Sequence, residues 1–224
     1  KKPSDNFIKI FDNSLKQYVQ YNTKFTTPMK NQYFMSKFKS FVGNNYIKVE
    51  KTNLDIGFRN KTTQFSSVKS DIYKYKNIHT CILPKNKPIL KINFSNNPCC
   101  YYGKPKIILA HKMYGLPYYD KEGVYGIPTK DNYVIINKTH DEFLKIEKIF
   151  NSKCIRLIFN SFRFRMATIE KEAFEFIPNL SLLNRIDWDF FDSSLLTHIK
   201  ADLALYEIMT KCDIHTNIFK KIFI

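Results

Sequence analysis

Residues 104–150 read KPKIILAHKMYGLPYYDKEGVYGIPTKDNYVIINKTHDEFLKIEKIF, and the spacing of the apolar residues changes within this stretch. Two short β-prone runs, at 106–110 and 133–136, flank a segment at 115–128 that is rich in Gly and Pro. Branched and aromatic side chains favour strands, whereas Gly and Pro favour turns. The first part of the stretch therefore predicts two strands that are joined by turns.

The second part of the stretch predicts a helix that begins at Thr139. Thr139 and Glu142 have the spacing of a capping box, in which each residue bonds the backbone of the other. The apolar residues that follow recur at helical spacing and are Phe143, Ile146, Ile149 and Phe150. A second apolar helix face is predicted at 155–162, with Asn151 and Ser152 as the joint between the two helices.

The segments outside this stretch predict further strands and helices. Short β-prone runs at 46–49, 80–83 and 89–94 predict strands, and the last of them alternates apolar residues with Lys91 and Asn93. Residues 4–22 predict a short amphipathic helix from the spacing of Phe7, Ile8, Phe11, Leu15, Tyr18 and Val19. Another helix is predicted at 192–211.

Together these elements predict an α+β fold. Short mixed or antiparallel strands occupy the N-terminal and middle regions, and a mainly helical C-terminal third follows. Because strands and helices do not alternate regularly, a Rossmann-type domain is disfavoured. We expect a basic, strand-rich recognition region at 1–137 and a charge-neutral helical region at 138–224 that packs on it, with one continuous domain as the alternative.

The charge of the chain is concentrated in its first half. The 224 residues include 36 Lys+Arg and 20 Asp+Glu, for a formal net charge of +16. Residues 1–112 hold 21 of the basic residues and only five of the acidic ones, so the remaining residues are neutral overall. Such asymmetry favours a surface that faces a polyanion. An AT-rich genome, which enriches Lys, Asn, Ile, Phe and Tyr, is the alternative explanation.

Composition also bears on the class and the compartment of the protein. A hydrophobic fraction of 44% with 16% aromatic residues allows a sizeable core and argues against disorder. No apolar run reaches the roughly 18 residues of a membrane span, so we expect no membrane partner. Five cysteines without a C-x-x-C pair argue against a disulfide framework and a structural zinc site. The expected location is intracellular, in the cytoplasm of a bacterium or of a virus-infected cell.

The sequence lacks the local motifs of several enzyme classes. It contains no G-x-G or G-K-[ST] loop for nucleotides, no G-x-S-x-G nucleophile elbow, and no carboxylate with Lys two positions later. His140 and Asp141 lie in the predicted helix cap, and the segment NNPCCY at 96–101 is interpreted as a turn. No catalytic or metal-binding residue is assigned, and whether the protein is an enzyme stays open.

A series of short motifs between residues 104 and 188 indicates a protein family more specifically than the composition does. The motifs are KPKIIL at 104–109, YYD at 118–120 with Gly123, YVII at 133–136, NSK at 151–153, FEFIPNL at 174–180 and IDW at 186–188. This order resembles the C-terminal target-recognition (specificity) region of restriction–modification adenine methyltransferases of the Eco57I/TaqI type, found in bacteria and large DNA viruses. The resemblance implies a module that docks on duplex DNA.

The resemblance also implies where the chemistry takes place. The cofactor S-adenosylmethionine is expected on a separate methyltransferase catalytic domain or subunit, and none in this chain. Phosphate contacts are expected from Arg59, Lys61, Lys74, Lys76, Lys104, Lys106 and Lys112. Base contacts are expected from His111, Tyr114, Tyr118, Tyr119, Arg163 and Arg165. The alternatives are solvated lysines, ordinary hairpin packing for the aromatic residues, and ion pairs of the two arginines with Glu170 or Glu172.

Three other functions remain open at this point. The interleaving of Tyr and Phe with Lys also suits an RNA-binding or RNA-processing factor. A metal-dependent nuclease is possible if dispersed carboxylates converge, the available residues being Asp120, Glu122, Asp131, Asp187 and Asp189. A non-enzymatic viral interaction protein, whose lysines bind an acidic partner, is the third.

Overall fold

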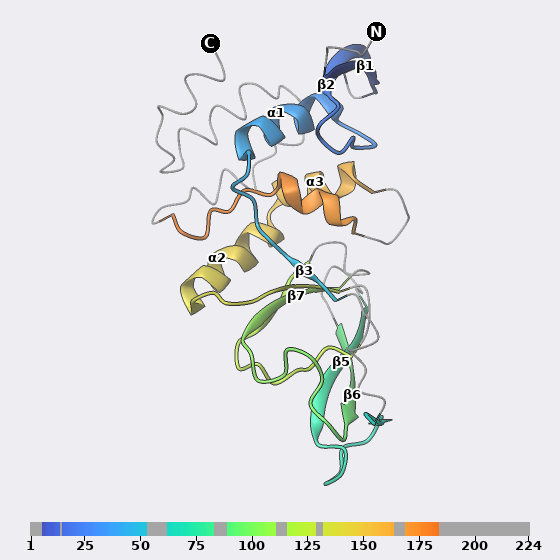
Figure 1. The fold of residues 1–224 in the computed structure, drawn as a ribbon, viewed down its shortest axis with the longest axis vertical. Helices are drawn as coiled ribbons and strands as arrows, with labels where there is room; N and C mark the ends of the chain where they lie inside the picture. The colour runs from blue at the N-terminus through green and yellow to red at the C-terminus, as the bar shows by residue number, and fades with distance from the viewer. Residues whose placement is uncertain are drawn as a thin grey trace. The chain divides into compact units, whose positions relative to one another are not determined.

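A computed structural model describes residues 6–13, 15–52, 62–82, 89–110, 116–128, 132–163 and 169–183. The fold is a mixed α+β fold that combines antiparallel sheets with helices (Figure 1). The chain forms two compact units. We call Lys1–Lys48 with Asn151–Ile224 the terminal unit, and Val49–Phe150 the central unit. The boundary after residue 137 stays a prediction based on charge and periodicity, and it coincides with neither limit.

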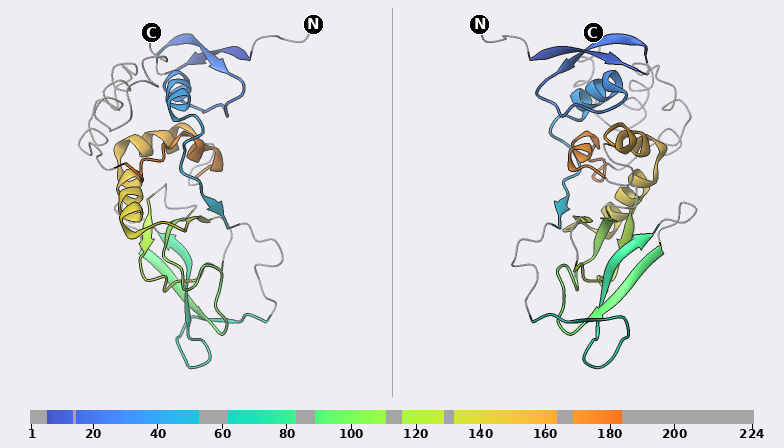
Figure 2. Two further views of the ribbon diagram at one scale, coloured as in Figure 1. Left: turned by 60° about the vertical axis from the view of Figure 1, so that its left-hand side comes forward. Right: turned by 90° about the vertical axis from the view of Figure 1, so that its right-hand side faces the viewer.

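The terminal unit begins with a β-hairpin, shown in blue in Figure 2. Strand β1 (Phe7–Asp12) pairs antiparallel with β2 (Gln17–Asn22). The prediction of a helix over residues 4–22 is therefore wrong. Val19 and Tyr21 are buried while both neighbours of Val19 are exposed, which is the period of two that a strand requires. The helical spacing of the other apolar residues in this segment is coincidental.

A buried aspartate holds the turn of this hairpin. Asp12 Oδ1 accepts a hydrogen bond from the Leu15 backbone N–H at 3.2 Å, and Oδ2 accepts one from the Tyr33 N–H at 2.9 Å. Lys16 adopts a left-handed conformation with φ of 55°, which reverses the chain before β2. Asp12 therefore joins the hairpin to the helix that follows it.

Helical elements form the rest of the terminal unit. They are α1 (Gln32–Val42), α3 (Lys153–Ser161) and the 3-10 helix η3 (Lys171–Phe176). Helix α1 contacts both α3 and η3. The rings of Phe162 and Phe176 lie 4.4 Å apart between centroids, so aromatic packing connects the end of α3 to η3.

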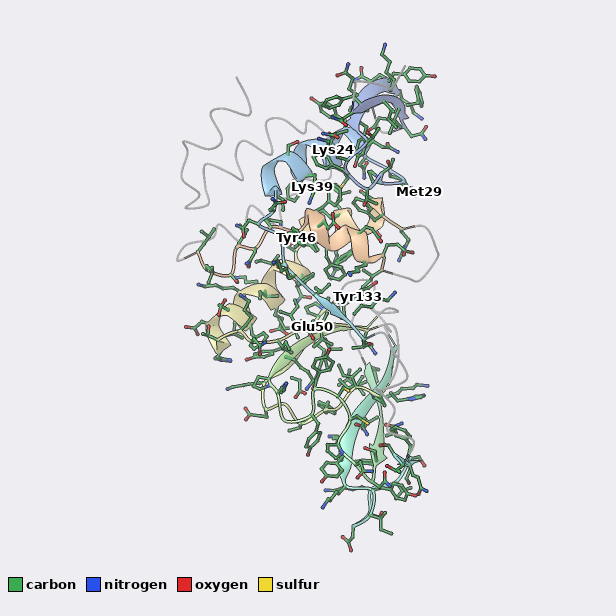
Figure 3. All side chains as sticks on the ribbon, viewed as in Figure 1. Lys24, Met29, Lys39, Tyr46, Glu50 and Tyr133 are labelled. Atoms are coloured by element: carbon green, nitrogen blue, oxygen red, sulfur yellow. The ribbon has the colours of Figure 1, made fainter. Side chains whose placement is uncertain are left out.

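Lys39 of α1 is a structural residue of the terminal unit (Figure 3). Its ammonium donates to the carbonyl oxygens of Gly43 at 3.2 Å and Glu175 at 3.1 Å. It also lies 5.0 Å from the centroid of the Tyr46 ring. Burial lowers the pKa of Lys39, and the negative charge of Glu175 opposes this shift.

The central unit contains two antiparallel sheets. The first has the strand order β3 (Glu50–Lys51), β9 (Asn132–Ile135), β7 (Lys106–Ala110) and β8 (Tyr118–Asp120). The second has the order β4 (Phe65–Ser66), β6 (Ile89–Ser95) and β5 (Tyr75–Ile82). Gly126 forms a parallel bridge with Asn77 of β5, so the segment after β8 also bonds to the second sheet.

The core of the central unit lies between the two sheets. Ile78 of β5, Ile108 of β7 and Val134 of β9 are buried in one cluster with Tyr125 and Ile127. Tyr119 of β8 lies on the opposite face of the first sheet, where its ring packs on Phe143 of helix α2 (His140–Asn151) with ring centroids 5.1 Å apart. Ile107 and Leu109 of β7, which lie on this same opposite face, are fully buried.

The structure confirms the strand at 106–110 and places β9 one residue before the predicted run at 133–136. The predicted strand at 46–49 is reduced to a bridge between Tyr46 and Pro178. Among the elements not predicted are α1, η3 and β8. Strand β8 has only three residues and lies in a segment rich in Gly and Pro, so its pattern does not stand out. The predicted helix at 192–211 lies outside the described residues.

The predicted capping box at the start of α2 is confirmed. Thr139 Oγ1 accepts from the Glu142 N–H at 3.3 Å, and the Glu142 carboxylate accepts from the Thr139 N–H at 2.9 Å. The Lys138 ammonium donates to the same carboxylate at 2.8 Å. These hydrogen bonds lower the pKa of Glu142 below its ordinary value of 4.5, and the bond from Lys138 has the largest effect.

The capping box predicts a pH dependence of stability. A carboxyl with a lowered pKa in the folded state stabilises the protein above its ordinary pKa, and this contribution is lost as the pH falls through the lowered value. We expect Glu142→Gln to reduce the free energy of unfolding at pH 7 by a few tenths to about 1 kcal/mol. Urea denaturation at pH 7 and pH 3 measures this. A difference between wild type and variant that is as large at pH 3 as at pH 7 would contradict the prediction.

Candidate nucleic-acid interface

A buried ion pair lies at the base of the candidate interface. Lys106 and Asp120 are directly opposite each other on β7 and β8. Their side chains are 0% and 2% exposed, and Lys106 Nζ lies 2.5 Å from Asp120 Oδ2. Burial lowers the pKa of Lys106, whereas the hydrogen bond and the charge of Asp120 raise it. The pair connects the first residue of β7 to the last residue of β8.

Both members of the pair also hold neighbouring loops. The Lys106 ammonium donates to the carbonyl oxygens of Tyr101 and Lys104, each at 3.0 Å, so its three hydrogens all have acceptors. Asp120 accepts backbone N–H bonds from Val124 and Tyr125, each at 3.0 Å. The two loops, 101–104 and 121–125, are thereby fixed to one buried centre.

Gly123 lets the two loops approach each other closely. Its φ is +67°, and a Cβ atom there would lie 2.6 Å from the Lys104 backbone nitrogen. The Gly123 carbonyl accepts the Gly103 N–H at 2.8 Å. Only glycine combines this backbone conformation with this contact. Asp120 and Gly123 are three residues apart because both belong to the tight loop that contacts residues 101–104, Asp120 as its anchor and Gly123 at the close approach.

The prediction that Lys106 contacts phosphate is wrong. Its side chain is fully buried, and its donors are all used within the fold. The sequence does not reveal this, because a lysine at the start of a strand is usually solvated. Lys106 of the KPKIIL motif and Asp120 of the YYD motif therefore form a structural ion pair.

Exposed cationic and aromatic side chains gather next to the loop at 101–104. The rings of Tyr75 and Tyr102 meet edge to face, with centroids 5.2 Å apart. Lys74 Nζ lies 5.4 Å from the centroid of Tyr75, and Lys74 and Lys104 are exposed. Tyr102 is 37% exposed. We call Lys74, Tyr75, Tyr102 and Lys104 the central-unit patch.

Two other predicted residues meet beside the core. Lys76 Nζ lies 4.9 Å from the centroid of Tyr125, and the Tyr125 ring meets Tyr118 edge to face at 5.8 Å. Lys76 and Tyr118 are half-buried, whereas Tyr125 is buried. Because Asp120 binds the Tyr125 backbone, the buried ion pair also sets the position of the ring that supports Lys76.

Tyr119 lies on the opposite face of the sheet from Tyr118. Its hydroxyl and His140 Nδ1 share a hydrogen bond of 2.8 Å, and its ring stacks on the His140 ring. Burial raises the pKa of the Tyr119 hydroxyl, and the charges of Glu122 and Glu147 add to this shift. Successive residues of a strand point to opposite faces, so the two adjacent tyrosines do not act on one surface.

The other predicted site residues divide into two groups. Arg163 is described in the terminal unit, where it is half-buried just after α3. The remaining residues lie outside the described ranges and are Arg59, Lys61, His111, Lys112, Tyr114 and Arg165. The prediction that these residues contact nucleic acid therefore stays a prediction.

Tyr75, Tyr102 and Lys91 were not among the predicted contacts, although each had a signal in the sequence. Tyr75 and Tyr102 belong to the runs that interleave tyrosine with lysine. Lys91 alternates with apolar neighbours on β6 and is exposed. The sequence signal of this patch is therefore the neighbourhood of tyrosine and lysine along the chain, at the start of β5 and in the loop at 101–104.

Comparison with protein-family models, curated proteins and solved structures found nothing similar to this chain. Within the described ranges, no three His, Cys, Asp or Glu side chains are placed to hold a metal ion. No helix in the described part of the chain has the length and apolar character of a membrane span.

The buried ion pair predicts a large effect of one substitution. We expect Lys106→Met to lower the free energy of unfolding by about 3 kcal/mol or more, because Asp120 would remain buried without its cationic partner. Chemical denaturation followed by circular dichroism measures the loss.

Lys104→Met is the matched control, because Lys104 is exposed two residues away. We expect this variant to change the free energy of unfolding by less than about 0.5 kcal/mol. Equal losses in the two variants would show that the ion pair does not stabilise the unit.

Proposed function

We propose that this chain is a DNA-binding target-recognition module of a restriction–modification adenine methyltransferase. It docks on duplex DNA, and a separate catalytic part modifies the target adenine. The observation that carries the proposal is the central-unit patch, whose loop is anchored by Lys106 and Asp120. These two residues belong to the motifs on which the resemblance to that family rests.

The charge of residues 62–105 in the central unit supports the proposal that the ligand is a polyanion. The described residues between 62 and 105 include five lysines and a single acidic residue, Asp71. Four of these lysines are exposed and one is half-buried, and they are Lys69, Lys74, Lys76, Lys91 and Lys104. Ammonium groups on a surface attract phosphates and release the counterions condensed on DNA.

The rigidity of the patch supports recognition as well as attraction. Both loop carbonyls that flank Tyr102 and Gly103 accept bonds from Lys106, so the loop does not have to become ordered on binding. Phosphate contacts from Lys74 and Lys104 would set the register on the duplex, and Tyr102 would reach the groove between them. The lysines supply affinity, and the tyrosine supplies discrimination.

The chain's own residues do not fit a site for S-adenosylmethionine. The sequence has no G-x-G element, and the closest pair of glycines, Gly123 and Gly126, serves other contacts. Gly123 packs on the Lys104 backbone, and Gly126 packs on Asn77 and Cys99. We therefore assign the cofactor and the methyl transfer to the separate catalytic part, which reaches an adenine that has been flipped out of the duplex.

The nuclease alternative loses one of its candidate ligands. The Asp120 carboxylate is buried and binds Lys106, Val124 and Tyr125. An RNA-binding function uses the same chemistry of lysine and tyrosine as the proposal does. Competition between duplex DNA and RNA of the same sequence separates the two functions.

The proposal predicts a salt-dependent affinity for duplex DNA. We expect the Lys74→Ala/Lys104→Ala double variant to bind a random duplex more weakly at 50 mM salt. We also expect the slope of log K against log salt to decrease by up to about 2, since each lost phosphate contact removes about 0.9 from it. Fluorescence anisotropy over a salt series measures both quantities.

Lys171→Ala is the control for this experiment, because Lys171 is an exposed lysine of η3 in the terminal unit. It should leave the affinity and the slope unchanged. Wild-type protein that binds duplex DNA equally well at 50 mM and 500 mM salt would disprove the proposal. Preferential displacement of the duplex by RNA would favour the RNA-binding function instead.

A further inference from the structure

The outer face of the β1–β2 hairpin is a second surface that combines aromatic rings with lysine. Alternation places Ile8 and Ile10 on the same face as the buried residues Val19 and Tyr21, their partners across the hairpin. The opposite face carries six side chains of the two strands. They are Phe7, Lys9 and Phe11 on β1, and Tyr18, Gln20 and Asn22 on β2.

The rings on this outer face are open to solvent. Phe7 is 53% exposed, Phe11 is 42% exposed and Tyr18 is 71% exposed. Phe11 and Tyr18 are cross-strand partners whose rings meet at 70° with centroids 5.3 Å apart. In such a T-shaped pair, one ring turns only its edge toward the other and keeps both of its faces clear of it. Aromatic rings with free faces are the groups on which bases stack.

The exposed charges of residues 6–30, the segment that contains the hairpin, have one sign. The described residues from 6 to 30 contain four lysines, all exposed, namely Lys9, Lys16, Lys24 and Lys30. The acidic residue in this range is Asp12, which is 0% exposed and binds the backbone of Leu15 and Tyr33. Lys9 lies on the outer face itself, and no carboxylate of residues 6–30 is exposed.

We propose that the outer face of the β1–β2 hairpin binds an unpaired nucleic-acid strand, with bases stacked on Phe7, Phe11 and Tyr18 and a phosphate at Lys9. This site is separate from the central-unit patch and goes beyond the function proposed above. Its ligand class is single-stranded DNA or RNA, which share the same combination of phosphates and free base faces.

The position of Lys9 favours a nucleic acid over an apolar protein partner. Lys9 lies between Phe7 and Phe11 on the same face, and its cross-strand partner is Gln20. An apolar partner that covered both phenylalanines would remove the ammonium from water without neutralising it, which is unfavourable. A phosphate between two stacked bases neutralises it instead.

The spacing of the rings suits several nucleotides. Phe7 and Phe11 are four residues apart on β1, which corresponds to about 14 Å along a strand. Bases in a duplex are stacked on each other, so their faces are not available to these rings. An unpaired strand exposes its base faces, and each can lie on a separate ring.

The test uses fluorescein-labelled 12-nucleotide oligothymidylate and oligouridylate, with affinity measured by fluorescence anisotropy on the full chain. We expect Tyr18→Ala and Phe11→Ala each to weaken binding about fivefold or more, because each removes a stacking ring. Tyr18→Phe keeps the ring and should bind within about twofold of wild type. The oligonucleotide that binds more tightly identifies the natural source as DNA or RNA.

Leu182→Ala is the matched control, because Leu182 is an apolar residue of the terminal unit and is 71% exposed, as Tyr18 is. It should leave the affinity unchanged. Thermal unfolding of each variant checks that the fold is intact, and the high exposure of Tyr18 makes a loss of stability unexpected. Lys9→Ala should weaken binding at low salt and reduce its salt dependence.

Two results would overturn the proposal. The first is an affinity for both oligonucleotides that is unchanged in Tyr18→Ala and Phe11→Ala. The second is equal weakening by Tyr18→Phe and Tyr18→Ala, which would exclude stacking on the ring. Lys74→Ala/Lys104→Ala protein should keep its single-strand affinity while losing duplex affinity, so that failure of one site is distinguishable from failure of the other.

Discussion

The buried ion pair of Lys106 and Asp120 is the constraint on which the central unit depends. Two isolated charges inside a protein are strongly unfavourable, and they are tolerated only when hydrogen bonds satisfy every remaining donor and acceptor. Here the ammonium has three oxygen acceptors, and the carboxylate binds two backbone N–H groups in addition. Because these partners belong to two separate loops, the pair determines where both loops lie.

This constraint links the fold to the proposed interface. The loop that Lys106 holds carries Tyr102 and Lys104, and the loop that Asp120 holds carries Tyr125, over which Lys76 lies. Residues with a role in stability therefore alternate with exposed residues that are available for binding. A lysine in a cationic segment is not necessarily a ligand contact, and burial distinguishes Lys106 from Lys104, which is only two positions away.

The terminal unit and the central unit both carry exposed lysines near aromatic rings, and both do so with antiparallel strands. In both, two antiparallel strands turn apolar residues toward a core, and lysines such as Lys9 and Lys91 lie at exposed positions of a strand. On β1, this alternation accounts for the position of Lys9 between Phe7 and Phe11. Within the terminal unit, Asp12 is the acidic residue among residues 6–30, and because it is buried it does not offset the four exposed lysines of that range.

The sequence by itself determined the elements whose signals are local. The capping box at Thr139, the apolar face of α2 and the β-prone run at 106–110 all depend on residues close together in the chain, and all three are present in the structure. Only the tertiary structure decided that residues 7–22 form a hairpin, that Lys106 is buried and that Tyr118 and Tyr119 serve different faces. These outcomes depend on partners distant in sequence, such as Tyr33 for Asp12, and apolar spacing within one segment does not contain that information.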